Sequence, residues 1–212
     1  MVIVSRRGMV SLLAAAAVKN PEWQGTELRL VSVHEAAAQE SLSFARYPDP
    51  VLREAGQAVQ RFDDDLAKTV RKLQAARKRE GAVGLAATQC GVDAKIVVLD
   101  DDTVFVNPEI IKRNDIVDCW IETCLVLPPD VSVETLRLRD IDVRARDLRG
   151  RPFATTLTGE KARAMQHEMD HARGILIIDH AYDLPDSRAF PPLKDIETPL
   201  HTQRRNKAYS FL

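Results

Sequence analysis

The stretch Gln166–His171, which reads QHEMDH, constrains the fold of this chain more than any other part of its sequence. His167 and His171 are four residues apart. On a helix such positions share one face, so both imidazoles reach a single metal ion. Glu168 then lies beside the metal, where its carboxylate takes a proton from a water molecule. The stretch therefore predicts a helix that holds one divalent metal for hydrolysis, provided that the chain supplies a third ligand.

No downstream residue fits the spacings that metalloproteases with this motif use for their third ligand. The spacing H-E-x-x-H-x-x-G-x-x-H is met by Gly174, but it then requires a histidine where Ile177 stands. His180 comes three residues too late. Glu197 lies among prolines, where a long ligand-bearing helix is not expected.

Cys124, upstream of the motif, is the better third ligand. It lies in the apolar, strand-like segment Trp120–Val126. A thiolate and two imidazoles leave the fourth metal position to water, as in catalytic zinc sites. A closed structural site that also uses Cys119 is the alternative. However, side chains five apart in an extended segment point to opposite faces, and a structural site has no use for Glu168.

Composition excludes several classes of function. The net charge of -1 gives no reason to expect nucleic acid or an anionic membrane as partner, and 5% aromatic residues are too few for a base-stacking surface. No apolar run approaches the ~18 residues of a membrane span. The two remaining cysteines, Cys90 and Cys119, are expected as small buried apolar residues. The odd total of three indicates a reducing compartment rather than a disulfide framework.

With two further motifs in the expected order, the sequence resembles the peptide deformylase family. The family carries G-x-G-L-A-A-x-Q, then E-G-C-L-S, then Q-H-E-x-D-H. Here these motifs read AVGLAATQ over Ala82–Gln89, ETCLV over Glu122–Val126 and QHEMDH over Gln166–His171. The resemblance covers about residues 46–181. Three ordered motifs are far more specific than one metal motif alone.

The resemblance implies a metal-dependent hydrolase that removes the formyl group from N-formylmethionine on newly made polypeptides. It implies Cys124, His167 and His171 as ligands of one divalent metal. Fe2+ is the usual ion of the family, and Zn2+, Ni2+ or Co2+ can replace it. Glu168 carries the proton. The side-chain amide of Gln89 and the backbone N–H of Leu125 donate to the developing oxyanion.

Four other residues are expected to support the site. By resemblance, Gly84 lets the substrate backbone pass close, and Arg137 hydrogen-bonds that backbone. Taken by itself, Arg137 in a charged strand would be a solvated surface residue. Glu122 is expected to brace its strand or to orient a ligand histidine, and Asp170 to form a structural ion pair.

Three positions depart from the family motifs. Ala82 and Thr123 replace glycines, and Val126 replaces a serine. Lost glycines narrow a groove or change its backbone, so substrate range and turnover are the properties most affected. These departures motivate one alternative, a divergent paralogue that binds N-terminal peptides with weak turnover. A small metallopeptidase or amidase that uses the same site is a separate alternative.

The periodicity of apolar residues predicts an α+β domain, with antiparallel sheets around the helix that carries the metal motif. Helices are expected over residues 62–80 and 160–172, with Gly81 and Gly174 ending them. A tight turn is expected over residues 147–151. Strands are expected over residues 95–99, 103–106, 120–126, 131–133, 141–146, 153–157 and 174–179.

The chain divides into three parts by composition. Residues 1–45 form an N-terminal extension, residues 46–183 the catalytic domain and residues 184–212 a proline-rich tail. The first 21 residues are basic and free of acid, which favours a mitochondrial or plastid presequence over a secretory signal or a native helix. Without such a segment the protein would be cytoplasmic. The charged run Arg77–Glu80 is expected as a solvated helix end, with a ribosome contact as the alternative.

Overall fold

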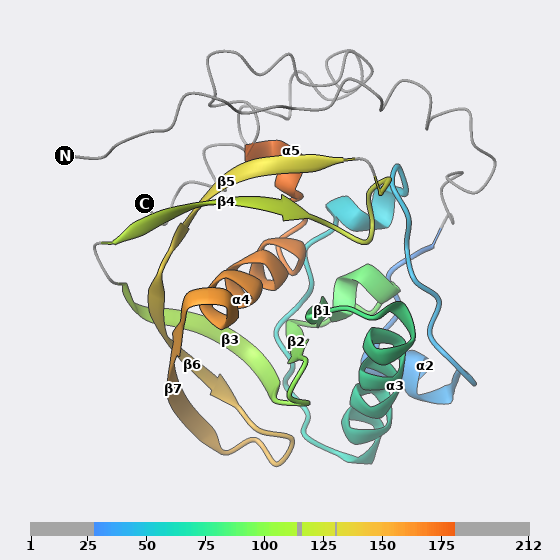
Figure 1. Cartoon of the computed structure of the whole chain (residues 1–212). Helices are drawn as coiled ribbons and strands as arrows, with labels where there is room; N and C mark the ends of the chain where they lie inside the picture. The colour runs from blue at the N-terminus through green and yellow to red at the C-terminus, as the bar shows by residue number, and fades with distance from the viewer. Residues whose placement is uncertain (1–27, 114–115, 130, 181–212) are drawn as a thin grey trace.

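The computed structural model describes residues 28–113, 116–129 and 131–180 of the chain. Its strands form two antiparallel sheets, one of five strands in the order β1-β2-β3-β6-β7 and one of two strands, β4 and β5. Helix α4 (Gly159–His171) lies between these sheets (Figure 1). The predicted α+β architecture around a central motif helix is confirmed. The strands are β1 (Gly84–Ala86), β2 (Ile96–Leu99), β3 (Val104–Arg113), β4 (Val117–Thr123), β5 (Ser132–Leu138), β6 (Asp140–Arg146) and β7 (Pro152–Thr158).

Helix α4 is held on both sides. Ala162 and Met165 are fully buried in a core that includes Phe105 and Ile141 of the large sheet. On the opposite side, Gln166 ties α4 to β5, because its side chain accepts from the backbone N–H of Leu138 at 3.0 Å and donates to the same residue's carbonyl at 2.8 Å. The glutamine that opens the motif thus fixes the helix against the small sheet.

Helix α3 (Asp64–Glu80) confirms the helix predicted from the repeat of apolar residues at intervals of three and four. Asp63 caps it by accepting from the N–H of Leu66 at 3.2 Å. Gly81 ends it in the left-handed conformation at φ 67°. Its apolar face, with Leu66 and Leu73 fully buried, covers a second core beside β1 and β2.

The strand predicted over residues 174–179 is wrong, because a one-turn helix, α5 (Ile177–His180), stands there. A short apolar run such as Ile175–Ile178 fits a buried strand and a buried helix equally well by periodicity. Asp179 favours the turn: its carboxylate accepts from the N–H of Leu176 at 2.8 Å and pairs with Arg53 at 2.6 Å.

Part of the N-terminal extension belongs to the folded unit. Helix α2 (Val33–Ala38) begins with a capping box between Ser32 and Glu35 and packs on α3. Ala36 and Leu42 are buried in the same core as α3. The folded unit therefore includes residues 28–45, and the boundary expected at residue 46 comes too late. The expected targeting segment and the proline-rich tail fall within residues 1–27 and 181–212, outside the described residues. Two 3-10 helices complete the fold, η2 (Pro50–Arg53) and η3 (Ala87–Cys90).

Candidate functional site

The three expected metal ligands meet at one point. Sγ of Cys124 lies 3.1 Å from Nε2 of His171 and 3.4 Å from Nε2 of His167, and the two imidazole nitrogens are 3.2 Å apart. Ligands placed tetrahedrally at ordinary metal distances are about 3.3 Å (N to N) and about 3.5 Å (N to S) from one another. The triangle of donor atoms therefore fits one divalent metal with a further position open to the groove.

The local fold explains this meeting. His167 and His171 share one face of α4 because they are one turn apart. Cys124 follows directly after β4, whose last residue is Thr123. The strand expected over residues 120–126 therefore lies three residues earlier in the chain, and Cys124 is in the turn after it. Cys119, which would have closed a structural site, is exposed on β4 and has its sulfur 2.8 Å from the carboxylate of Glu134. The closed-site alternative is thus wrong, as is the expectation that Cys119 is buried.

Glu122 orients the first ligand. Its carboxylate lies 2.9 Å from Nδ1 of His167, and a carboxylate accepts hydrogen bonds, so the ring proton stays on Nδ1 and Nε2 remains available to a metal. Arg137 donates two hydrogen bonds to the same carboxylate, at 2.9 and 3.0 Å. Burial alone would raise the pKa of Glu122, but His167 and Arg137 hold it well below its usual range.

Arg137 does not reach the groove. Its side chain is 4% exposed and its guanidinium is shared between Glu122 and Asp170, at 2.5 Å from the latter. The expected contact with substrate and the alternative of a solvated position are both wrong for Arg137. Arg137 lies opposite Asp118 in the pairing of β5 with β4, and its side chain points toward α4. Glu122 and Asp170 accept the hydrogen bonds that were expected to go to a substrate carbonyl.

Asp170 forms the structural ion pairs expected of it. Besides Arg137 it pairs with Arg173 and, at 3.0 Å, with Nε2 of His180. Burial alone would raise the pKa of Asp170, but Arg137 and His180 hold it well below its usual range. The cluster connects β5, α4 and α5 directly behind the metal ligands.

Glu168 faces the groove from a buried position. Its Oε2 atom has no hydrogen-bond partner among the described residues, although it is fully shielded. Burial raises the pKa of Glu168 to about 7, against the lowering effect of His167 and of the Ala86 backbone N–H. An orphaned, buried carboxylate oxygen beside the ligands calls for a proton or a polar ligand there, which supports the same metal-and-water site.

Gly84 makes room for that carboxylate. A Cβ atom on Gly84 would lie 2.7 Å from Cγ and 2.9 Å from Oε1 of Glu168. The glycine therefore sets the position of the Glu168 carboxylate. The close approach of substrate expected at Gly84 stays a prediction.

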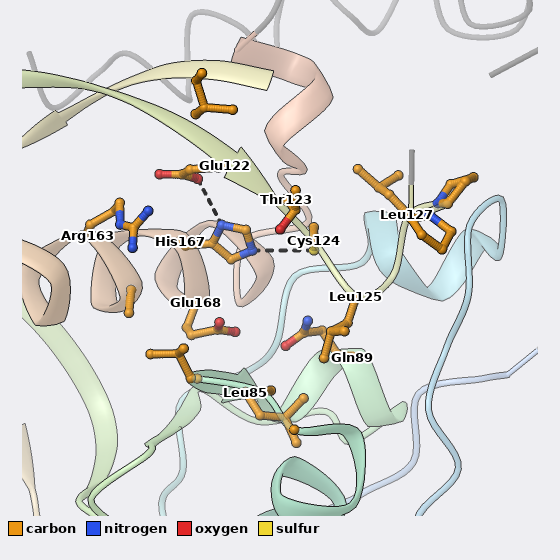
Figure 2. A pocket seen from close by; sticks show the side chains of 18 of the residues that line it. Leu85, Gln89, Glu122, Thr123, Cys124, Leu125, Leu127, Arg163, His167 and Glu168 are labelled. Atoms are coloured by element: carbon orange, nitrogen blue, oxygen red, sulfur yellow. Dashed lines mark hydrogen bonds and ion pairs between the residues drawn. The ribbon is translucent and has the colours of Figure 1, made fainter. Parts of the chain in front are cut away.

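Gln89 is fixed in the orientation that an oxyanion donor needs. Its Oε1 atom accepts from the N–H of Ala86 at 2.7 Å, which leaves the NH2 group to donate. Figure 2 shows the nitrogen of this amide on the side of Cys124. Leu125, directly after the cysteine, lines the groove and is 39% exposed. The donor roles of Gln89 and of the Leu125 N–H remain proposals that this placement supports.

A groove with a volume of about 700 Å³ opens over these residues (Figure 2). Several of its walls are apolar: Val83, Leu85, Ile121, Leu125 and Leu127. Two departures from the family motifs, Ala82 and Thr123, line it. Val126 does not: it is fully buried in the core, and its backbone carbonyl accepts from the N–H of Tyr47 at 2.7 Å. Val126 therefore contributes to the packing of the core, and its methyl groups stand where the family motif has a serine hydroxyl.

One lining residue was missed by the sequence analysis. Arg163 stands on α4 one turn before His167, with its guanidinium carbon 4.6 Å from the ring centre of Trp120. The signal was present in the spacing, because position 163 shares the motif face of the helix with 167 and 171. A charged residue on a helix face is ordinarily solvated, so this spacing alone does not assign Arg163 to the groove.

Comparisons with known proteins agree with this geometry. A family model described as polypeptide deformylase matches residues 41–186. The peptide deformylase of Thermotoga petrophila is 37% identical over 136 residues, which cover 63% of this chain and 82% of that protein. Peptide deformylase 1B of Arabidopsis thaliana, named as chloroplastic/mitochondrial, is 29% identical over 163 residues, 73% of this chain and 59% of that protein.

The fold is also similar to solved structures. The crystal structure of the peptide deformylase from Thermotoga maritima matches with a TM-score of 0.63 and 34% sequence identity, over 67% of this chain and 98% of that one. The matched family model spans most of the chain, including all three motifs and the whole described metal site. The chain therefore belongs to the polypeptide deformylase family.

Proposed function

We propose that this chain is a metal-dependent hydrolase that removes the formyl group from N-formylmethionyl peptides of newly made proteins. The observation that carries the proposal is the convergence of Cys124, His167 and His171 beside the buried carboxylate of Glu168, at the floor of an open groove. Family membership supplies the reaction, and the groove provides room for an extended peptide.

Cys124, His167 and His171 would hold the metal. A divalent metal bound there lowers the pKa of a water molecule and polarises a carbonyl oxygen. We propose Fe2+ as the physiological ion and Zn2+, Ni2+ or Co2+ as substitutes, since a thiolate with two imidazoles suits iron and zinc alike.

The chain's own residues then perform the proton transfers. Glu168 accepts the proton of the attacking water and passes it to the leaving amine, a task that suits a carboxyl whose pKa burial raises to about 7. The Gln89 amide and the Leu125 N–H donate to the oxygen of the formyl group as negative charge develops on it. One such donor is worth about 3 kcal/mol of barrier. Glu122 and Arg137 keep His167 in place throughout.

The test is release of formate from formyl-Met-Ala-Ser by protein purified without oxygen and loaded with Fe2+. We expect Glu168→Ala to lower the rate by about 10²-fold or more, because it removes the proton carrier. The metal content should be unchanged, since Glu168 is not one of the three donors. Formate release by the variant at the wild-type rate would refute the assigned role.

The same assay separates the two alternatives. Wild-type protein that holds one metal but releases no formate would favour a divergent peptide binder and direct attention to Thr123. An acetylated peptide, acetyl-Met-Ala-Ser, provides the other arm. If it is cleaved as fast as the formylated one, the protein is a broader amidase or peptidase.

The proposed partner is the nascent formylated peptide. The ribosome contact considered for the run Arg77–Glu80 loses support, because Arg77 and Lys78 pair with Asp102 at 3.2 and 2.7 Å and Arg79 pairs with Glu80 at 3.1 Å. No helix within the described residues is long and apolar enough to cross a bilayer.

We further propose a mitochondrial or plastid location. The acid-free, basic first 21 residues support it, as does the chloroplastic/mitochondrial name of the Arabidopsis relative. A fluorescent protein fused after residue 27 should accumulate in the organelle, whereas a diffuse signal would favour the cytoplasm.

A further inference from the structure

Arg163 is a groove residue for which the proposed reaction has no use. It lies one helical turn before His167, and its side chain is 21% exposed. Its guanidinium stacks on the indole ring of Trp120, with 4.6 Å between the guanidinium carbon and the ring centre. Figure 2 shows Arg163 beside His167, at the opposite end of the groove from Leu127.

The positive charge of Arg163 is weakly compensated. Its partner is Glu160, at 3.1 Å, whose side chain is 68% exposed, and such a surface pair contributes little. Glu122, an acid of the same groove, has its carboxylate held by Arg137 and His167. Arg46, the other arginine of the groove, is paired with Glu80 at 2.9 Å. Of the two arginines that line the groove, Arg163 is thus the less neutralised.

The guanidinium also has donors to offer. It carries five N–H groups in a rigid plane. Within the described part of the chain, the hydrogen bond that we find from it is the one to Glu160. The cation–π contact with the Trp120 ring restricts the movement of this group.

The position of Arg163 relative to the metal ligands determines which part of a substrate can reach its guanidinium. Positions i and i+4 of a helix are about 5–6 Å apart at Cβ, and His167 binds next to the reacting carbonyl. A formyl group attacked there is bonded to the amine of the first residue. The side chain of that residue, if it is long and unbranched, extends over one helical turn and ends near Arg163.

We propose that Arg163 is a specificity-determining residue: among formylated first residues of about the length of methionine, it favours a side chain that ends in a hydrogen-bond-accepting oxygen over one that ends in an apolar group. The proposal rests on the deformylase function given above. Methionine sulfoxide and glutamine have this chemistry, whereas norleucine has the length of methionine with an apolar end. An apolar end would cover the guanidinium donors without replacing their water, and this is unfavourable.

The experiment compares formyl-X-Ala-Ser peptides with X as methionine, norleucine, methionine sulfoxide or glutamine. For the wild-type enzyme we expect kcat/KM for the sulfoxide to exceed that for norleucine by about tenfold, the effect of one charge-assisted hydrogen bond. Arg163→Leu should bring this ratio to about one or below, and Arg163→Lys should restore part of it. The control is Arg139→Leu, which removes an exposed arginine paired with Asp118 away from the groove and should leave the ratio unchanged.

An unchanged ratio in Arg163→Leu would overturn the proposal. If the wild-type protein hydrolyses none of the four peptides, the proposed function fails, and the selectivity is then measured by calorimetry. In that case the metal-loaded protein should bind the unformylated peptide with methionine sulfoxide about tenfold more tightly than the one with norleucine. Equal affinities would refute the role of Arg163 independently of catalysis.

Discussion

The carboxylate of Glu168 is positioned by a residue that has no side chain. Gly84, on β1, leaves the space that Glu168 on α4 occupies, and the nearest Glu168 atom would lie 2.7 Å from an added Cβ. A distance under 3 Å cannot be tolerated, so any larger residue at position 84 must move the carboxylate. This contact connects two of the three sequence motifs through packing.

Replacing Gly84 with alanine should therefore impair the chemistry and leave the metal in place. We expect kcat to fall by about 10²-fold, because a displacement of about 1 Å at a catalytic group has that effect. Metal content and formate release are measured on the same sample. The matched control is Ala82→Gly, which removes a Cβ from a neighbouring groove residue. Wild-type kcat in Gly84→Ala would show that the contact is unimportant.

Single site residues were predictable where a motif dictates the chemistry. Cys124, His167 and His171 lie together as expected. The spacing of the two histidines fixes their geometry on any helix, whereas Cys124 was indicated by its place in the second motif. Arg137 was not predictable, since its inward direction depends on which face of β5 packs on α4. Arg163 was equally hidden, because nothing in its neighbours along the chain shows that the groove runs past it.

At the scale of secondary-structure elements, helix ends determine how α4 meets its neighbours. The turn after α4 passes through Gly174 at φ 73°, where a Cβ would lie 2.3 Å from the backbone oxygen of Arg53. Gly81, after α3, has a similar φ of 67° but no atom within 4 Å of an added Cβ. A substitution at Gly81 therefore introduces backbone strain alone, whereas one at Gly174 introduces strain together with a close contact.

Alanine at these two positions should destabilise the protein to different degrees. Gly81→Ala meets strain alone and should lower the free energy of unfolding by about 1 kcal/mol. Gly174→Ala adds a collision with backbone and should cost roughly 3 kcal/mol. Urea unfolding of both variants measures the difference. Equal losses would mean that the contact with Arg53 relaxes without cost.

The elements themselves were predictable to the extent that their apolar pattern is long. Helix α3 and strands β2, β6 and β7 were expected within a residue or two. Strand β3 is longer than expected, since its second half, up to Arg113, is mostly exposed and shows no alternation of apolar and polar residues. The α5 turn was read as a strand because four apolar residues carry no period, and the hydrogen bond of Asp179 to Leu176 depends on folding.

For the whole molecule, the metal site joins two structural units. Cys124 comes from the end of the small sheet, whereas His167 and His171 come from α4, which packs on the large sheet. Gln166 and Asp170 tie the same two units from the motif helix. A bound metal therefore acts as a cross-link, while the buried ion pairs keep the ligands together.

Metal removal should destabilise the fold without abolishing it. Because the metal binds the folded site and not the unfolded chain, a free concentration of 100 times Kd stabilises by about 2.7 kcal/mol. We expect urea unfolding of the apoprotein to shift by about this amount on addition of Zn2+. Cys124→Ser should show a much smaller shift, since a hydroxyl is a poor ligand. Identical curves with and without metal would contradict the cross-link.

The motif order predicted the architecture of the molecule, but it did not predict where the folded unit begins. The helix between two antiparallel sheets is the expected one. The packing of residues 28–45 was not expected, because a short helix such as α2 obtains its stability from α3, through bonds such as that of Thr69 to the Val33 carbonyl at 2.9 Å. A local pattern does not reveal such tertiary support.

The most direct test of the account is a titration of apoprotein with Fe2+ under anaerobic conditions, followed by formate release from formyl-Met-Ala-Ser. If Cys124, His167 and His171 hold the one catalytic metal, activity rises linearly and stops at one equivalent per chain, and Cys124→Ala stays inactive at that point. Activity without metal, a plateau at two equivalents, or full activity of Cys124→Ala would each contradict it.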